Sequence, residues 1–238
     1  MERIIFNVVI VTSACCWCEK YVFVQNQLNW PQARNYCKTH HTDFLALTNK
    51  KEEEVFKKYV NDDESKQGWI GIYWDGPSNE WKWSGGKSVT YLTTLSFSDK
   101  AKNIYWKKDN WEWRSGDNHY SFFCLNMLVV QEEKTWEDAL EFCSKKGTKL
   151  TSLLSATESL QAQNEIQPSV FTKQVWIGLR YLGDRWLWVN GDPMPYEAWP
   201  MGGDQDHQCP MLRRCGALTK QGVWESRDCQ EKLSFICA

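Results

Sequence analysis

The sequence predicts a mixed α+β protein made of two tandem domains of about 110 residues each. Three observations lead to this prediction: an internal repeat with an offset of 106 residues, two helical segments in each copy, and short strands separated by turn residues elsewhere. The length of 238 residues alone leaves both one and two domains open.

The repeat is carried by two segments, "LNWPQARNYCKTHHTDFLALTNKKEE" from Leu28 and "KTWEDALEFCSKKGTKLTSLLSATES" from Lys134. It continues through "GWIGIYWD" and "VWIGLRYL", "EWKWSGG" and "RWLWVNG", and "WEWRSGDNHYSFFC" and "WESRDCQEKLSFIC". Matched positions in the first segments are Trp30 and Trp136, Ala33 and Ala139, Cys37 and Cys143, Phe44 and Leu150, Leu47 and Leu153, and Glu52 and Glu158. Self-similarity at a fixed offset indicates two homologous domains.

Each copy has the same predicted order of elements. A first strand ("EKYVFVQ", "CLNMLVVQ") precedes a helix that opens near Trp30 or Trp136. A second helix follows "LTN" or "LLS", where Asn49 or Ser155 is a good N-cap. The glutamate three residues later gives each start the spacing of a capping box. The remainder, with its "WIG" segments and glycine turns, predicts short strands and long loops.

Composition excludes some classes of partner and compartment. The formal net charge is -2 and the pI is near 6.1, so no basic excess draws the chain to nucleic acid. The 10 cysteines are many for this length and are typical of disulfides formed in an oxidising compartment, which favours secretion.

The N-terminus has the outline of a cleavable signal peptide over residues 1–16. Arg3 is followed by an apolar run from Ile4 to Val11 and then by the small residues Ser13 and Ala14. The alternative is that Ile4 to Val11 forms a buried first strand. No other stretch approaches the roughly 18 apolar residues of a membrane helix, so we expect a soluble, extracellular mature chain without a transmembrane anchor.

The landmarks "W..A..(Y/F)C", "L..L.S..E", "WIG", "W.W..G" and a closing "W.....C.......C" resemble the C-type lectin-like domain family, as found in soluble or receptor-derived double-domain lectins. The resemblance covers nearly the whole chain twice, as residues 17–125 and 126–238. It implies an α+β fold with two helices, antiparallel sheets, a long loop region and disulfides in each domain.

The resemblance also implies three disulfides, Cys37 to Cys124, Cys143 to Cys237, and Cys215 to Cys229. A bridge that closes a loop of about 90 residues is worth on the order of 4–5 kcal/mol in the chain-entropy model. The first domain departs from the family, because Gly116 stands where the second has Cys229. We therefore expect its loop from Tyr91 to Lys108 to be less constrained.

Calcium-dependent members of the family place ligands at positions that can be aligned here. The loop tripeptide Glu-Pro-Asn or Gln-Pro-Asp becomes Gly203-Asp204-Gln205, so the proline is missing. The loop carboxylate becomes Arg213, and the triplet Trp-Asn-Asp becomes Trp224-Glu225-Ser226. Calcium takes six to eight oxygen ligands, and a nearby arginine opposes it. We predict no certain cofactor and at most weak calcium binding.

Some candidate residues remain in this degenerate loop. The candidates for carbohydrate binding are Asp204, Gln205, Asp206, Glu225 and Trp199, and those for weak metal binding are Asp204, Asp206 and Glu225. The alternative is a solvated acidic loop, partly neutralised by Arg213 and Arg214. A zinc site of Asp204, Asp206, His207 and Cys209 is disfavoured, because zinc sites usually use separated pairs of ligands.

Tryptophans offer another route to carbohydrate, since sugar rings stack on aromatic faces. The loop candidates are Trp106, Trp111, Trp113 and Trp199. Seven others match core positions of the family: Trp69, Trp81, Trp83, Trp176, Trp186, Trp188 and Trp224. In the first domain Asp109, Asn110 and Asp117 are scattered and favour turns and a surface strand rather than a metal site.

Three function classes follow from these observations. The leading prediction is a secreted lectin-like protein for immune recognition of glycans on cells or microbes, and the alternative is a calcium-independent module that binds a protein ligand. An enzyme is disfavoured, since His40, His41, His119 and His207 have no catalytic partner at a recognisable spacing. Ice binding occurs within this fold family, but no residue here singles it out. Cys18 and Cys209 either join the domains or link two chains as a dimer.

Overall fold

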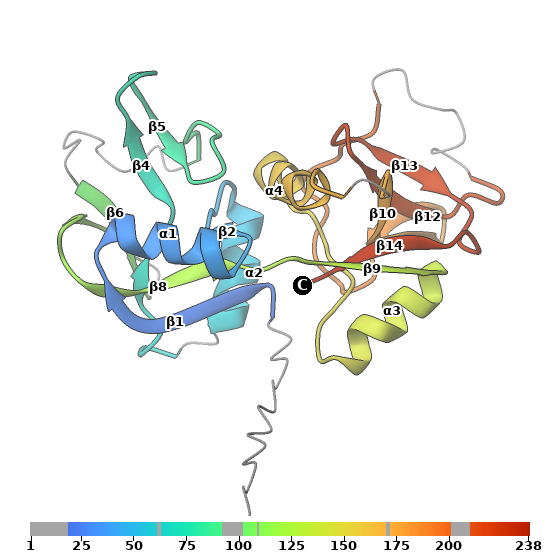
Figure 1. The fold of residues 1–238 in the computed structure, drawn as a ribbon, viewed down its shortest axis with the longest axis horizontal. Coiled ribbons are helices and arrows are strands. Elements are labelled where there is room, and N and C mark those ends of the chain that lie inside the picture. The colour runs from blue at the N-terminus through green and yellow to red at the C-terminus, as the bar shows by residue number, and fades with distance from the viewer. Residues whose placement is uncertain (1–18, 61–62, 92–101, 109, 170–171, 201–209) are drawn as a thin grey trace, which may run out of the picture.

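The structure is a computed structural model, and it describes residues 19–60, 63–91, 102–108, 110–169, 172–200 and 210–238. Figure 1 shows two α+β domains side by side, with the C-terminal end of the chain near the centre. The segment 1–16 that is predicted to be a signal peptide, Cys18 and the loop segment 201–209 lie outside the described residues. The predictions made for them stay predictions.

The first domain contains two helices and eight strands among its described residues. In chain order they are β1 (Tyr21–Leu28), α1 (Trp30–His40), β2 (Asp43–Phe44), α2 (Lys50–Val60), β3 (Gly68–Trp69), β4 (Ile72–Asp75), β5 (Glu80–Trp83), β6 (Lys102–Lys107), β7 (Asn110–Ser115) and β8 (Tyr120–Leu125).

The second domain repeats this order with fewer breaks. Its elements are β9 (Leu128–Lys134), α3 (Trp136–Lys145), α4 (Ala156–Ile166), β10 (Gln174–Leu182), β11 (Arg185–Trp188), β12 (Cys215–Thr219), β13 (Trp224–Arg227) and β14 (Leu233–Cys237). Only Asn126 and Met127 separate β8 from β9, and Met127 is buried, so the connection between the domains is short.

The sequence repeat becomes a repeat of sheet topology. The main sheet of the first domain has the order β1-β8-β3-β6-β7, and that of the second has β9-β14-β10-β12-β13. In both, the last strand of the domain pairs antiparallel with the first and parallel with the "WIG" strand. This identity of strand order confirms the prediction of two homologous α+β domains.

The matched tryptophans explain why the landmarks recur. The Trp30 indole donates to the Ile70 carbonyl (2.8 Å), and the matched Trp136 indole donates to the Ile177 carbonyl (2.9 Å). Both indoles are buried, and each ties the start of the first helix to the "WIG" strand. An apolar replacement would remove this donor and most of the buried side-chain volume, so both the hydrogen bond and the packing would be lost.

The helix starts agree with the sequence, with one correction. Asn49 and Ser155 accept bonds from the amides of Glu52 (3.0 Å) and Glu158 (3.1 Å), as N-caps do. The predicted capping box is wrong, however, because the glutamates do not return to the N-cap amides. Their Oε2 atoms accept instead from the amides of the preceding residues, Thr48 and Leu154. Both carboxylates thereby turn inward, and both are buried.

The structure contains the three disulfides that the family resemblance implies, Cys37–Cys124, Cys143–Cys237 and Cys215–Cys229. In the first domain, the Gly116 carbonyl accepts from the Trp30 amide (2.9 Å), just as the Cys229 carbonyl accepts from the Trp136 amide (3.0 Å). The missing short bridge therefore leaves the local backbone pairing intact.

The predicted loop from Tyr91 to Lys108 is too long, since Lys102–Lys107 is strand β6, paired along its length with β7.

The two domains share one hydrophobic cluster. It contains Phe56 and Leu45 from the first domain and Leu154, Ala162 and Ile166 from the second. Asn49 Nδ2 also donates across the boundary to the Leu154 carbonyl (3.0 Å). Burial of this shared apolar surface favours docking of the domains against each other rather than free movement about the short connection.

The glycine of the first "WIG" segment allows a close approach of backbone segments. A Cβ added at Gly71 would lie 2.8 Å from the Leu45 carbonyl oxygen, whereas one at Gly76 would meet nothing within 4 Å. We predict that Gly71→Ala lowers the free energy of unfolding by about 1–3 kcal/mol. Denaturant unfolding with the disulfides intact measures this. Gly76→Ala is the control and should change stability by less than about 0.5 kcal/mol; equal effects would contradict the prediction.

Candidate functional site

The candidate site is a cavity of about 290 Å³ in the second domain, where β12 and β13 approach the end of the long loop. Residues from three segments line it: Trp199, Pro200, Arg213, Trp224, Glu225, Ser226 and Arg227. Two of the predicted site residues, Trp199 and Glu225, therefore lie at one cavity. The other three, Asp204, Gln205 and Asp206, lie outside the described residues.

Aromatic side chains form one part of the cavity. Trp224 is fully buried, and its ring packs edge-on against Trp199 at 5.7 Å and Trp188 at 5.3 Å between centroids. Trp199 is half-buried and also packs against Trp186 at 4.9 Å. The Trp224 amide donates to the Ala198 carbonyl (2.8 Å), which fixes the end of the long loop beside β13. Trp199 is therefore an aromatic surface held in place by core tryptophans.

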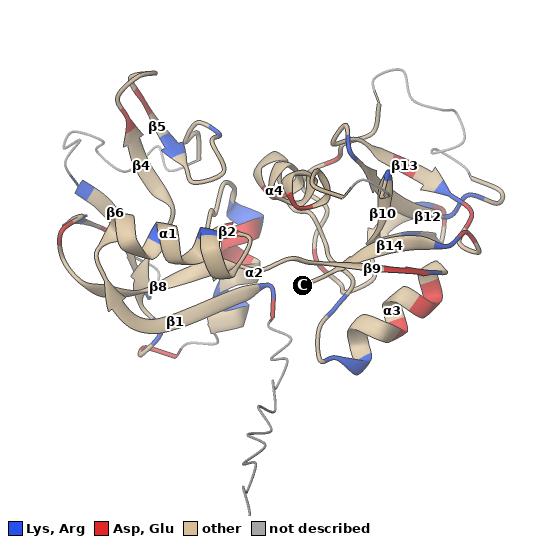
Figure 2. Cartoon of the chain, in the orientation of Figure 1, with Lys and Arg blue, Asp and Glu red and all other residues tan. Residues whose placement is uncertain are grey.

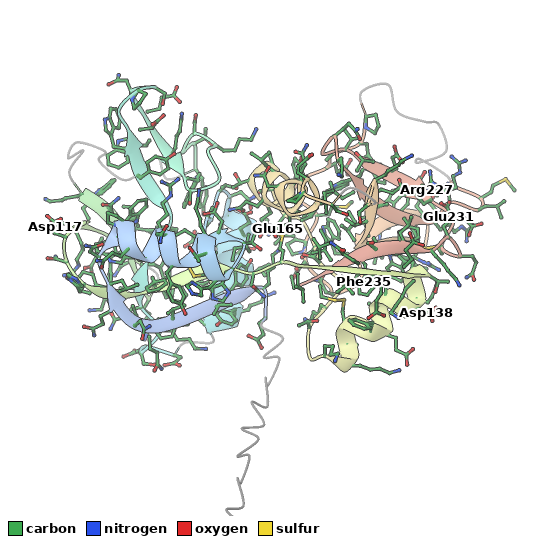
Figure 3. All side chains as sticks on the ribbon, viewed as in Figure 1. Asp117, Asp138, Glu165, Arg227, Glu231 and Phe235 are labelled. Atoms are coloured by element: carbon green, nitrogen blue, oxygen red, sulfur yellow. A yellow bond between two sulfur atoms is a disulfide. The ribbon has the colours of Figure 1, made fainter. Side chains whose placement is uncertain are left out.

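Charged side chains form another part. Residues along β13 alternate between faces, so Trp224 and Ser226 are buried whereas Glu225 and Arg227 are half-exposed. Arg227 Nη1 lies 3.9 Å from Glu225 Oε2, and its Nη2 lies 2.5 Å from Glu231 Oε2. Figure 3 shows Arg227 and Glu231 close together at the outer side of the domain, and Figure 2 shows both signs of charge on β13.

The Glu225 carboxylate has a further neighbour on β10. In the amide orientation that satisfies both groups, Gln174 donates to Glu225 Oε2 (3.1 Å) and accepts from Arg227 Nη2 (3.3 Å). Carboxylate, amide and guanidinium thus form one polar row beside the aromatic surface. Planar groups of this kind both donate and accept hydrogen bonds in fixed directions.

The described part of this site does not fit calcium. Arg213 lines the cavity in place of a carboxylate, and Ser226, a buried residue, offers only a hydroxyl. Glu225 is the one carboxylate among the described lining residues, and Arg227 lies beside it. A calcium ion takes six to eight oxygen ligands and is repelled by guanidinium groups, so the described lining residues do not make up a calcium ligand set.

The zinc alternative falls wholly outside the described residues, since Asp204, Asp206, His207 and Cys209 all do. Among the described residues, one group of three potential ligand atoms lies close together, on Glu137, Cys215 and Cys229. Those two cysteines form a disulfide and offer no thiolate, so this group is not a metal site.

The first domain has an altered version of the same strand. Trp111, Glu112 and Arg114 on β7 correspond to Trp224, Glu225 and Arg227, and Arg114 forms an ion pair with Glu112. Trp113 takes the place of Ser226 and packs against Trp81 at 4.9 Å.

Trp106 was predicted as a loop candidate, and that prediction is wrong: it is 2% exposed and packs edge-on against Phe56 in the core. Of the seven predicted core tryptophans, all are buried except the half-buried Trp81.

Three residues at or beside the cavity were not predicted from the sequence: Arg227, Gln174 and Pro200. A signal for Arg227 was present, because the pattern Trp-Glu-x-Arg occurs in both copies, as "WEWR" from Trp111 and "WESR" from Trp224. Gln174 becomes a neighbour only through the pairing of β10 with β12 and of β12 with β13, which no local pattern encodes.

Comparison with known proteins agrees with this geometry. The family model of the lectin C-type domain matches residues 26–127 and 132–238. The chain belongs to this family. Members of the C-type lectin domain family are generally non-enzymatic binding modules. The three disulfides of the chain are consistent with an extracellular protein.

The chain is also similar to individual proteins, over one or both of its domains. The chain is 24% identical over 247 residues to the secretory phospholipase A2 receptor of Bos taurus. This match covers 87% of this chain and 17% of the receptor. It is 32% identical over 137 residues to snaclec stejaggregin-A subunit alpha of Trimeresurus stejnegeri, covering 52% of this chain and 78% of the snaclec. The solved structure of human lithostathine is 27% identical, with a TM-score of 0.42, covering 47% of this chain and 88% of lithostathine.

The chain spans about one sixth of the length of the receptor that it matches, at 17%. No helix among the described residues is both long enough and apolar enough to cross a membrane.

The loss of calcium ligands can be tested by restoring them. We predict that Arg213→Glu combined with Ser226→Asp gives the full chain measurable calcium binding, because two carboxylates then join Glu225 around the cavity. The unaltered chain should bind calcium no more tightly than the millimolar range. Titration calorimetry measures both. Micromolar affinity of the unaltered chain would show that the loop supplies ligands despite Arg213.

Proposed function

We propose that this protein is a secreted recognition protein that binds carbohydrate on cells or microbes directly, through the cavity of its second domain and without high-affinity calcium. The observation that carries the proposal is the placement of the Trp199 ring beside the polar row of Glu225 and Arg227 in one cavity. Sugars present apolar ring faces and rows of hydroxyls, so they need both kinds of surface together.

The polar row can replace the metal in chemical terms. Glu225 is an acceptor for ligand hydroxyls, and its side chain keeps 42% of its surface exposed. Arg227 is a fixed donor because Glu231 holds its guanidinium from the other side. Hydrogen bonds to ionised groups are worth roughly 1.5–3 kcal/mol each, which suits weak, direct sugar recognition.

A protein ligand is the second candidate, and one observation favours it. Met211 and Leu212 are 85% and 78% exposed, and they directly precede Arg213, which lines the same cavity. Methionine and arginine are enriched at protein interfaces, and exposed neighbouring apolar side chains are a common mark of them. Such a partner would present an apolar patch with acidic groups around it.

A glycan array probed with the full chain separates these candidates. We expect binding to a subset of glycans that is unchanged by a calcium chelator, since the described site lacks a calcium ligand set. Loss of binding on chelation would contradict the calcium-independent part of the proposal. Absence of any glycan binding, with or without calcium, would favour the protein ligand.

Matched substitutions test the cavity itself. Glu225→Gln keeps the shape of the side chain but removes its charge, and we expect glycan affinity to fall roughly tenfold. Glu112→Gln alters the matched glutamate of the first domain and is the control, so it should leave glycan affinity unchanged. Met211→Ser with Leu212→Ser should also leave glycan binding intact. Surface plasmon resonance on an array hit measures all three; an equal loss with Glu112→Gln would remove the assignment to the second domain.

A further inference from the structure

The boundary between the domains buries two matched glutamates. Glu52 at the start of α2 is 0% exposed, and Glu158 at the start of α4 is 1% exposed. Each accepts a bond from the loop before its helix, at the amide of Thr48 or Leu154. Buried carboxylates are stable only when a cation or enough hydrogen bonds compensate for the loss of water.

That compensation is unequal. Lys20 reaches across from the first domain, and its Nζ lies 2.9 Å from Glu158 Oε2 and 3.0 Å from the Ser152 carbonyl. The repeat-equivalent of Lys20 is Asn126, whose side chain lies by His41 instead. Within the described residues Glu52 therefore has no cation, and its Oε1 has no hydrogen-bond partner. Of the two buried acids, Lys20 thus pairs with Glu158.

The groups around Glu52 make its ionised form unfavourable. Glu158 faces it from α4, with the Ser155 hydroxyl nearby, while Asp192 and Lys20 lie on the Glu158 side. Burial, and then the charge of Glu158, raise the pKa of Glu52 to about 7, although the nearby Ser155 hydroxyl and the hydrogen bonds from Thr48 oppose the rise. The buried Tyr21 hydroxyl has no hydrogen-bond partner in the described part of the chain, and burial followed by the charges of Glu158, Glu52 and Asp192 raises its pKa.

A second acidic pair crosses the same boundary. Glu165 on α4 lies on the side of the second domain that faces the first (Figure 3). Burial, and then the charge of Asp43 on β2 of the first domain, raise the pKa of Glu165. Asp43 itself is held by the Ser84 hydroxyl (2.5 Å) and the Phe44 amide (2.7 Å). Both pairs therefore repel when fully ionised.

We propose that docking of the two domains is controlled by protonation: Glu52 holds a proton in the docked state, and its ionisation loosens the contact between α2 and α4. A cavity of about 410 Å³ between the domains, lined in part by Lys20, Tyr21, Ser152 and Asp192, gives water a route to this region. The proposal does not depend on which ligand the second domain binds.

The direction of the pH dependence follows from the raised pKa. An acid whose pKa is higher in the docked than in the separated state favours docking when it is protonated. For Glu52 the full contribution to docking is present below the pKa of the separated state, near 4.5. This contribution is lost as the pH rises to about 7, the pKa in the docked state. Docking should therefore be tighter at pH 5 than at pH 8. The docking constant should change roughly 50-fold between those values, and Glu165 adds to the change with the same sign.

Hydrogen exchange of the full chain tests this. Mass spectrometry reports the protection of peptides covering α2 and α4 at pH 5 and pH 8, after correction for the intrinsic exchange rates. We expect the opening constant of these peptides to be tens of times larger at pH 8, while peptides of β10 and β14 change little. Equal corrected protection of α2 and α4 at both values would overturn the proposal.

Variants identify the responsible groups. Glu52→Gln removes the charge and keeps the shape, so protection at pH 8 should rise toward its pH 5 value. Glu54→Gln is the matched control, because Glu54 lies on the same helix but is exposed and paired with Lys51. Lys20→Met should lower protection at pH 8, since Glu158 then loses its cation. If Glu52→Gln folds poorly, Glu165→Gln should still reduce the pH dependence; no reduction in either variant would overturn the proposal.

Discussion

The disulfide from the first helix to the last strand is the constraint on which each domain depends. Cys37–Cys124 and Cys143–Cys237 span 87 and 94 residues, and all four cysteines are buried. Each bridge joins elements from the two ends of the domain, so it fixes the sheet around which the loops are arranged. Closing loops of this length is worth on the order of 4–5 kcal/mol, comparable with the whole stability of a small domain. The first domain keeps its fold without a short bridge because the long one, the buried tryptophans and the Trp30–Gly116 backbone bond remain.

Docking of the domains creates a conflict between local and tertiary requirements. Glu52 and Glu158 each satisfy the backbone of the loop that precedes a helix, a local need that recurs in both copies. The shared hydrophobic cluster then brings the two helix starts together and removes both carboxylates from water. Lys20 compensates the charge of Glu158, whereas Asn126, at the matching position of the repeat, compensates neither carboxylate. Sequence divergence between the copies therefore makes a nearly symmetric interface electrostatically asymmetric.

Most of the architecture could be predicted from the sequence, because the repeat fixes the number of domains and the helix starts carry local signals at Trp30, Asn49, Trp136 and Ser155. Other features depend on contacts that no local pattern encodes. Trp106 lies in a stretch that the sequence predicts to be a loop. It belongs to β6 instead, and the pairing of β6 with β3 and β7 places the Trp106 side chain in the core. Glu52 and Glu158 have capping-box spacing, and only the packed loops show that their carboxylates bond one residue earlier. The cavity was predicted in part, at Trp199 and Glu225, whereas Arg227 joins it through strand alternation.

The difference between the two copies explains why a candidate site forms in the second. There Arg180 on β10 stacks on Trp136, pairs with Glu137 at 2.9 Å and contacts both sulfurs of the Cys215–Cys229 bridge. Arg180 therefore connects β12, the strand that follows the long loop, to α3, the first helix of the second domain. As a result β12 and β13 hold Glu225 and Arg227 in fixed positions. The matched residue in the first domain is Tyr73, covered by Arg34, and no bridge reaches β6. Trp113 takes the place of Ser226 there and joins an aromatic group with Trp81 and Trp74. Both strands thus carry a glutamate–arginine ion pair, and they differ at the position between the two charged residues, which is a buried serine in the second domain and a tryptophan packed on Trp81 in the first.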